Sequence, residues 1–86
     1  MVNDPEKQIG RIFGDVVRKY RARMDISQEE LAGRAGVDRT FISRIERGMR
    51  QPTITTILKL GLAFEISSTE LVRDTEIACK RAKIIK

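Results

Sequence analysis

The chain has 86 residues, enough for one compact domain, and its 17 Lys and Arg against 12 Asp and Glu give a net charge of +5. With no histidine, one cysteine, no glycine-rich phosphate loop and no catalytic pair or triad, it offers no metal site, cofactor site, intrachain disulfide or enzymatic centre. No apolar run approaches the roughly 18 residues that cross a membrane, and MVNDPEKQIG lacks a signal-peptide pattern, so we expect a cytoplasmic protein without a membrane partner.

Helix signals recur along the chain, whereas hairpin turns and alternating strand patterns are missing. We therefore predict an all-α fold of five helices. The first helix is expected from about Glu6 to Met24, and its inner stripe comprises Ile9, Ile12, Phe13, Val16, Val17 and Tyr20. The second covers residues 28–35 and follows the capping box Ser27-Gln28-Glu29-Glu30.

The other three helices are also marked by their caps. Asp38 can cap a third helix over residues 39–47, which stops at Gly48 because glycine readily adopts the left-handed backbone. Thr53 can cap a fourth helix over residues 54–64, and Ser67 can cap a fifth that begins near Ser68. Between these two stands Glu65, where glycine would be easier, and a left-handed conformation there costs on the order of 1 kcal/mol.

Positive charge is concentrated in two blocks of the chain. Residues 18–50 and residues 77–86 each carry a net charge of +4, whereas residues 51–76 between them carry −2. We assign residues 1–76 to one domain and residues 77–86 to a basic tail, which either continues the fifth helix or frays. This pattern favours a polyanionic partner, although a solvated surface can carry it as well.

The third predicted helix divides its side chains into a polar face and an apolar face. At 100° per residue, an arc of about 140° holds Arg39, Thr40, Ser43, Arg44 and Arg47. This arc contains arginines and small hydroxyls but no acid, whereas a merely solvated face usually mixes Lys, Glu and Gln. Arginine matches the major-groove edge of guanine, and Ser and Thr reach bases or phosphates.

The tight turn at Gly36-Val37 joins this helix to the preceding one as a helix-turn-helix, whose second helix enters the DNA major groove. The stretch SQEELAGRAGVDRTFISRIERGMRQPTITTILKL resembles the phage-repressor-like helix-turn-helix family of the XRE type, which includes lambda repressor and Cro. The resemblance covers roughly residues 8–72, and DRTFIS-x-IERG is similar above all to the small controller proteins of restriction–modification systems. It implies a five-helix, sequence-specific DNA-binding regulator of transcription.

The same resemblance implies roles for single residues. Base contacts are expected from Arg39, Thr40, Ser43 and Arg44, with Ser43 also able to reach a phosphate, and phosphate contacts from Gln28, Arg47 and Arg50. Glu46 matches a glutamate that the family often pairs with an arginine late in the first helix, which here is Arg21. We therefore expect a structural ion pair between these two residues. Phe41 either packs in the core, which we expect, or lies as a wedge near a thymine methyl.

Family members bind palindromic operators as homodimers, and the resemblance implies the same here. The expected dimer surface lies at the end of the fourth helix, the next loop and the fifth helix, and includes Ile66, Leu71, Thr75 and Ala78. The other interpretation is that this stripe packs on its own domain. No small-molecule ligand is evident.

Two rival functions belong to other classes. An antitoxin would bind and neutralise a toxin protein while repressing its own promoter, but it usually needs an additional toxin-binding segment, and only the short tail is available for that. A membrane-surface role for the basic tail is disfavoured, because the tail is short and lacks aromatic anchors.

Overall fold

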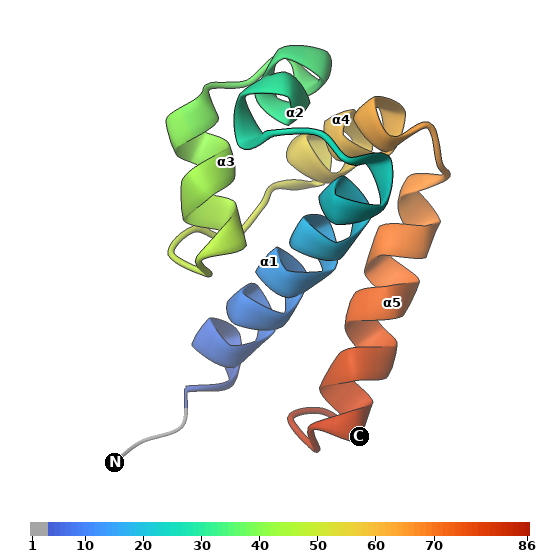
Figure 1. The fold of residues 1–86 in the computed structure, drawn as a ribbon. Coiled ribbons are helices and arrows are strands. Elements are labelled where there is room, and N and C mark those ends of the chain that lie inside the picture. The colour runs from blue at the N-terminus through green and yellow to red at the C-terminus, as the bar shows by residue number, and fades with distance from the viewer. Residues whose placement is uncertain (1–3) are drawn as a thin grey trace.

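A computed structural model describes residues 4–86, and these form five helices (Figure 1). The helices are α1 (Pro5–Met24), α2 (Gln28–Ala35), α3 (Arg39–Glu46), α4 (Ile54–Phe64) and α5 (Ser68–Arg81). No strand occurs within the described range, and the prediction of an all-α, five-helix fold is confirmed. No helix in this range is both long and apolar enough to cross a membrane.

The helix boundaries follow the predicted caps closely. The side chains of Ser27, Asp38, Thr53 and Ser67 each accept a hydrogen bond from a backbone N–H two or three residues later, at 3.0–3.4 Å. These bonds satisfy amides that the first helical turn leaves without a partner. The α3 helix is one residue shorter than expected, because Arg47 already leaves the helical conformation with φ −88° and ψ 0°.

Two turns use left-handed backbone where the sequence predicted it. Gly48, after α3, has φ +73°, and Glu65, after α4, has φ +58°.

The capping box before α2 forms only in part, because the Glu30 carboxylate accepts a hydrogen bond from Arg34 Nη2 at 2.7 Å. Ser27 thus caps α2 without the reciprocal contact that the motif predicts.

The long α1 helix runs through the middle of the molecule, with α3 on one side and α5 on the other (Figure 1). The α2 and α4 helices close one end of the molecule. The core contains the fully buried side chains of Val17, Leu31, Ile42, Ile45, Leu60 and Leu71. Within the predicted inner stripe of α1, Phe13, Val16 and Val17 are buried, whereas Ile9, Ile12 and Tyr20 are only half-buried.

Gly14 lets α1 approach the end of α3 very closely. A Cβ atom built on Gly14 would clash with the carbonyl oxygen of Ile45 and would lie 2.7 Å from that of Glu46. No side chain fits between these two backbones, so the absence of a Cβ at Gly14 sets the distance between the helices. The close approach fixes α3 relative to the rest of the fold.

The α5 helix packs its start and its end onto the domain. Leu71 is 0% exposed and Cys79 is 1% exposed, and burial raises the pKa of the Cys79 thiol. The prediction that Leu71 contacts a second copy is therefore corrected, because its side chain is buried in its own chain and has no surface to offer. Ile66, Thr75 and Ala78 remain half-buried.

Candidate nucleic-acid interface

The corner between α2 and α3 is built from local backbone geometry and small buried side chains. Gly36 adopts φ +68° at the end of α2, and the Val37 amide donates to the Ala32 carbonyl at 3.0 Å. Ala32 is 3% exposed, so it presents almost no bulk where the helices meet. These features hold α2 and α3 as the predicted helix-turn-helix.

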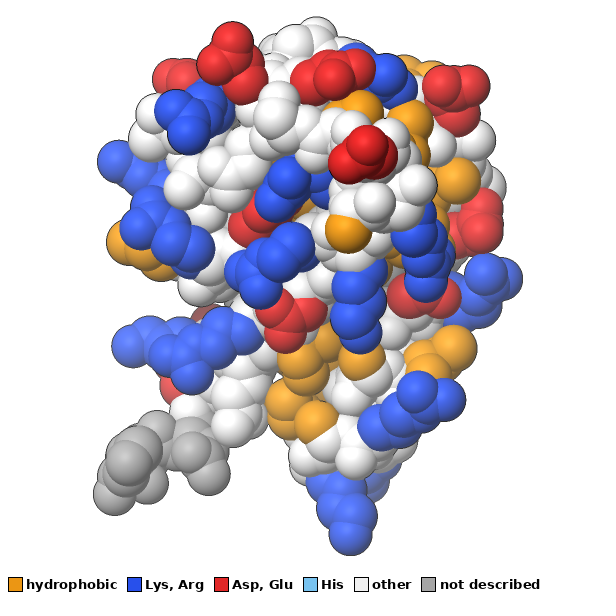
Figure 2. Space-filling model, in the orientation of Figure 1, with side chains coloured by type: hydrophobic (Ala, Val, Ile, Leu, Met, Phe, Trp, Pro, Cys, Tyr) orange, Lys and Arg blue, Asp and Glu red, His pale blue; other side chains and the backbone are white. Residues whose placement is uncertain are grey.

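The polar face predicted for α3 is turned to solvent. Arg39, Thr40, Arg44 and Arg47 are exposed and Ser43 is half-buried, whereas Ile42 and Ile45 on the opposite side are 0% exposed. Figure 2 shows Lys and Arg side chains gathered over α3, along one edge of the molecule. None of the three arginines on this face makes an ion pair within residues 4–86, so their charges are available to an anion.

Gln28, at the start of α2, lies beside this face. It lines a shallow hollow together with Arg39, Thr40 and Ser43. Its Nε2 atom donates to Glu46 Oε1 at 3.1 Å. The amide is therefore held with its nitrogen toward Glu46, and one N–H of that nitrogen remains for another acceptor.

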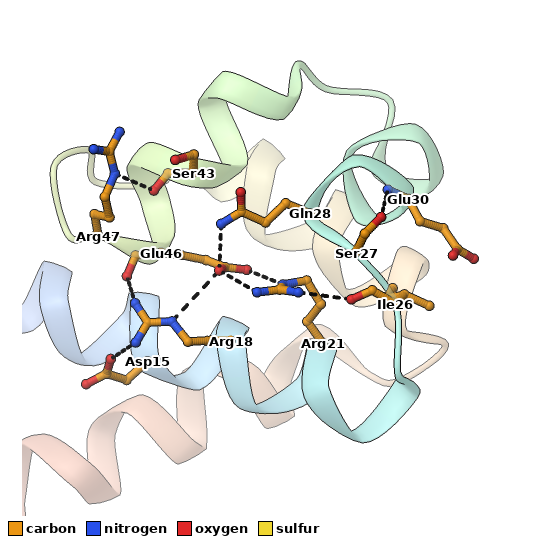
Figure 3. Close-up of polar contacts among 10 residues, drawn as sticks. All are labelled: Asp15, Arg18, Arg21, Ile26, Ser27, Gln28, Glu30, Ser43, Glu46 and Arg47. Carbon is orange, nitrogen blue, oxygen red and sulfur yellow. Dashed lines mark hydrogen bonds and ion pairs between the residues drawn. The ribbon is translucent and has the colours of Figure 1, made fainter.

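The buried carboxylate of Glu46 joins α3 to α1 (Figure 3). Arg21 donates through Nε to Oε2 at 2.7 Å and through Nη2 to Oε1 at 3.0 Å, and its Nη1 reaches the Ile26 carbonyl at 3.0 Å. The hydrogen bond to Glu46 raises the pKa of Arg21, which stays charged. The Arg21–Glu46 ion pair that the sequence predicted is present, and it is bidentate.

Arg18 also contacts Glu46, and the sequence did not predict this contact. Its Nη2 donates to the Glu46 carbonyl at 2.6 Å, its Nε lies 3.8 Å from Glu46 Oε1, and its Nη1 pairs with Asp15 at 3.2 Å. A cation there satisfies a carbonyl at the C-terminal end of α3, which the helix itself leaves without a partner. Arg18 stands three residues before Arg21, so both arginines lie on one face of α1, and this spacing could have predicted that both face Glu46.

The residues after α3 extend the basic surface. Arg47 donates from Nε to the Ser43 carbonyl at 3.3 Å, and Arg50 places its guanidinium carbon 5.5 Å from the centre of the Phe41 ring. Phe41 is half-buried and packs against the core, as expected, with Arg50 over its ring. Both arginines are exposed and carry positive charge past the end of α3.

This arrangement defines a DNA-binding protein of the helix-turn-helix class, with an exposed basic second helix on a compact all-α domain. A helix-turn-helix family model matches residues 17–71, and the chain belongs to that family. The family consists of DNA-binding regulators of transcription, which are not enzymes. No group of acidic or cysteine side chains within residues 4–86 is placed to hold a metal ion.

Relatives with similar sequences include controller proteins. The control protein C.BamHI of Bacillus amyloliquefaciens is 36% identical over 74 residues, which cover 84% of this chain and 91% of that protein. The crystal structure of the restriction-modification controller C.AhdI from Aeromonas hydrophila matches with 39% identity and a TM-score of 0.71, over 72% of this chain and 94% of that one. Wild-type C.Esp1396I, another such controller, matches with 27% identity and a TM-score of 0.76, over 85% and 95%.

Proposed function

We propose that this protein binds a palindromic DNA operator as a homodimer and regulates transcription in the manner of a restriction–modification controller. The observation that carries the proposal is the α3 face, where three exposed arginines lie beside the hydroxyls of Thr40 and Ser43 and make no ion pair within the described residues. Because the proposed target is DNA, the protein is proposed to act in the cytoplasm. The similarity to controller proteins supports this choice among the functions of the family.

In the proposed complex, α3 lies in the major groove. Arg39 and Arg44 contact base edges, and Thr40 and Ser43 reach a base or a nearby phosphate. Gln28 binds the phosphate backbone through the N–H that Glu46 leaves free, with help from the amides at the start of α2. Arg47 and Arg50 bind phosphates beyond the end of α3.

A homodimer is proposed because one recognition helix reads only a few base pairs. The α4 helix exposes an apolar stripe of Ile54, Leu58 and Leu62, which are 71%, 53% and 79% exposed. Val72 of the adjacent α5 is 49% exposed and lines a hollow with Ile57 of α4. A two-fold axis through this surface would bury the same apolar patch on both copies.

The experiment that tests the function is a binding selection from random DNA duplexes, followed by titration of variants. We expect the selected sequences to share a palindromic motif. Arg39→Ala and Arg44→Ala should each cost about 1–3 kcal/mol on that motif and relax its sequence, because they remove base contacts. Gln28→Ala should weaken all duplexes alike, because it removes a phosphate contact.

Arg34→Ala is the matched control for these variants. Arg34 lies on α2 within the same helix-turn-helix but pairs with Glu30 at 2.7 Å and lies 4.0 Å from Glu65, away from the α3 face. It should leave operator affinity unchanged. The proposal is wrong if Arg39→Ala and Arg44→Ala behave like this control. Co-purification of a tightly bound second protein would favour the antitoxin alternative instead.

A further inference from the structure

The edge of α1 beside α3 carries cations that the helix-turn-helix does not include. At 100° per residue, Lys7, Arg18 and Arg11 lie within about 40° of one another on α1. Arg18 is engaged with Glu46 and Asp15. Lys7 and Arg11 are exposed and make no ion pair within residues 4–86.

Two glycines place this edge directly at the end of α3. Gly14 lies about 20–60° from the three cations on α1 and touches the last carbonyls of α3. A Cβ on Gly48 would lie 2.6 Å from Arg11 Cγ and 2.8 Å from Arg11 Cα, so the stem of Arg11 rests on the Gly48 backbone. Arg11 is thereby fixed beside the segment that carries Arg47 and Arg50.

Basic side chains on this side of the molecule lie both over α3 and beside the N-terminal half of α1 (Figure 2). Asp15, on the same α1 edge, is already paired with Arg18 at 3.2 Å, and the Asp4 carboxylate caps α1 by accepting a hydrogen bond from the Glu6 amide at 3.0 Å. Glu6 lies about 100° around the helix from Lys7. The surface next to α3 therefore remains positive.

We propose that Lys7 and Arg11 extend the DNA interface beyond the helix-turn-helix by binding backbone phosphates of the same duplex, next to the end of α3. This inference rests on the proposed function, because α3 must occupy the groove for α1 to reach the backbone. Lys7 and Arg11 lie outside the recognition helix, so their contribution is electrostatic and independent of base sequence. They hold the domain on the duplex and select no base.

The salt dependence of binding measures such contacts directly. Each phosphate neutralised on B-form DNA releases counterions and steepens the plot of log K against log salt by about 0.9. Losing one contact therefore lowers the slope by about 0.9 and weakens binding by up to about eightfold at 0.1 M salt. The loss should be the same on the operator and on an unrelated duplex.

The test compares Lys7→Gln, Arg11→Gln and the double variant with wild type across a salt series, on both duplexes. Glutamine keeps part of each stem, so the packing of residue 11 on Gly48 is largely retained, and circular dichroism checks the fold. The matched control is the double variant Lys19→Gln/Arg81→Gln. It removes the same two charges from the hollow between α1 and α5, on the far side of α1 from α3 (Figure 1).

We expect the Lys7→Gln/Arg11→Gln variant to lose about 2 units of salt slope on both duplexes, while the control keeps the wild-type slope. The inference fails if the slope stays at the wild-type value, or if the control loses as much, which would reveal only an effect of net charge. If Arg39→Ala and Arg44→Ala impair operator binding in either case, the proposed function stands and only this inference falls. If wild type prefers no duplex, both are wrong.

Discussion

At the scale of single residues, Glu46 shows how one buried charge can organise a DNA-binding face. Its carboxylate accepts hydrogen bonds from Arg21 of α1 and Gln28 of α2, and its carbonyl accepts one from Arg18. The ion pair with Arg21 followed from the resemblance, because Glu46 lies in the family motif and Arg21 matches the arginine that the family places late in the first helix. The bond from Gln28 did not, because it depends on how α2 packs beside α3.

Glu46→Gln should therefore destabilise the fold. It removes the negative charge that Arg21 faces, and breaking a buried pair costs about 3–5 kcal/mol. Because the Arg21 side chain is 21% exposed and can regain some water, we expect about 3 kcal/mol in urea unfolding. Glu29→Gln, at an exposed position of α2, should change the unfolding free energy by no more than about 0.5 kcal/mol. Equal effects for the two variants would contradict a stabilising role for the pair.

At the scale of elements, helix boundaries could be predicted because caps act locally. Ser27, Asp38, Thr53 and Ser67 bond to amides only two or three residues away, so the sequence around each already contains the information. The approach of α1 to α3 could not be predicted in this way. From the sequence alone, Gly14 is only a residue of low helix propensity. The structure shows why a glycine is required there: the α3 backbone lies too close for a Cβ atom.

Gly14→Ala tests this close approach. The new Cβ would lie 2.7 Å from the Glu46 carbonyl, so backbone must shift, and we expect a loss of about 2 kcal/mol despite the better helix propensity of alanine. Gly33→Ala is the control, because a Cβ on this α2 residue meets nothing within 4 Å. It should stabilise the fold by up to about 1 kcal/mol. Thermal or urea unfolding of both variants measures the difference, and a stabilising Gly14→Ala would show that the approach is not tight.

At the scale of the whole molecule, the sequence predicted the exposed face of α3 better than the surfaces of α4 and α5. The polar arc of α3 differs sharply in chemistry from its apolar side, so solvent exposure follows from amphipathicity. Leu71 and Leu62 are chemically the same, yet one is 0% and the other 79% exposed. Only the packing of α5 on α1 and α4 separates the core leucine from the one on the surface.

Because Leu71 is buried while Leu58 and Leu62 are exposed, we propose that the dimer forms through the α4 stripe. Leu58→Glu/Leu62→Glu places two charges in the α4 stripe and should abolish dimers in sedimentation equilibrium, because burying unpaired carboxylates is costly. Ile77→Glu is the matched control, since Ile77 is 41% exposed on α5 but lines the hollow toward α1. It should remain dimeric.

The same double variant should separate dimerisation from DNA contact. Its α3 face is unchanged, so it should bind a single half-site as wild-type monomer does, but lose the added affinity of the full palindrome, in which both half-sites are held about one helical turn apart. Titration of half-site and full-site duplexes measures both quantities. If the variant still dimerises and keeps full-site affinity, the α4 stripe is not the interface, and Ile66 and Thr75 become the residues to test.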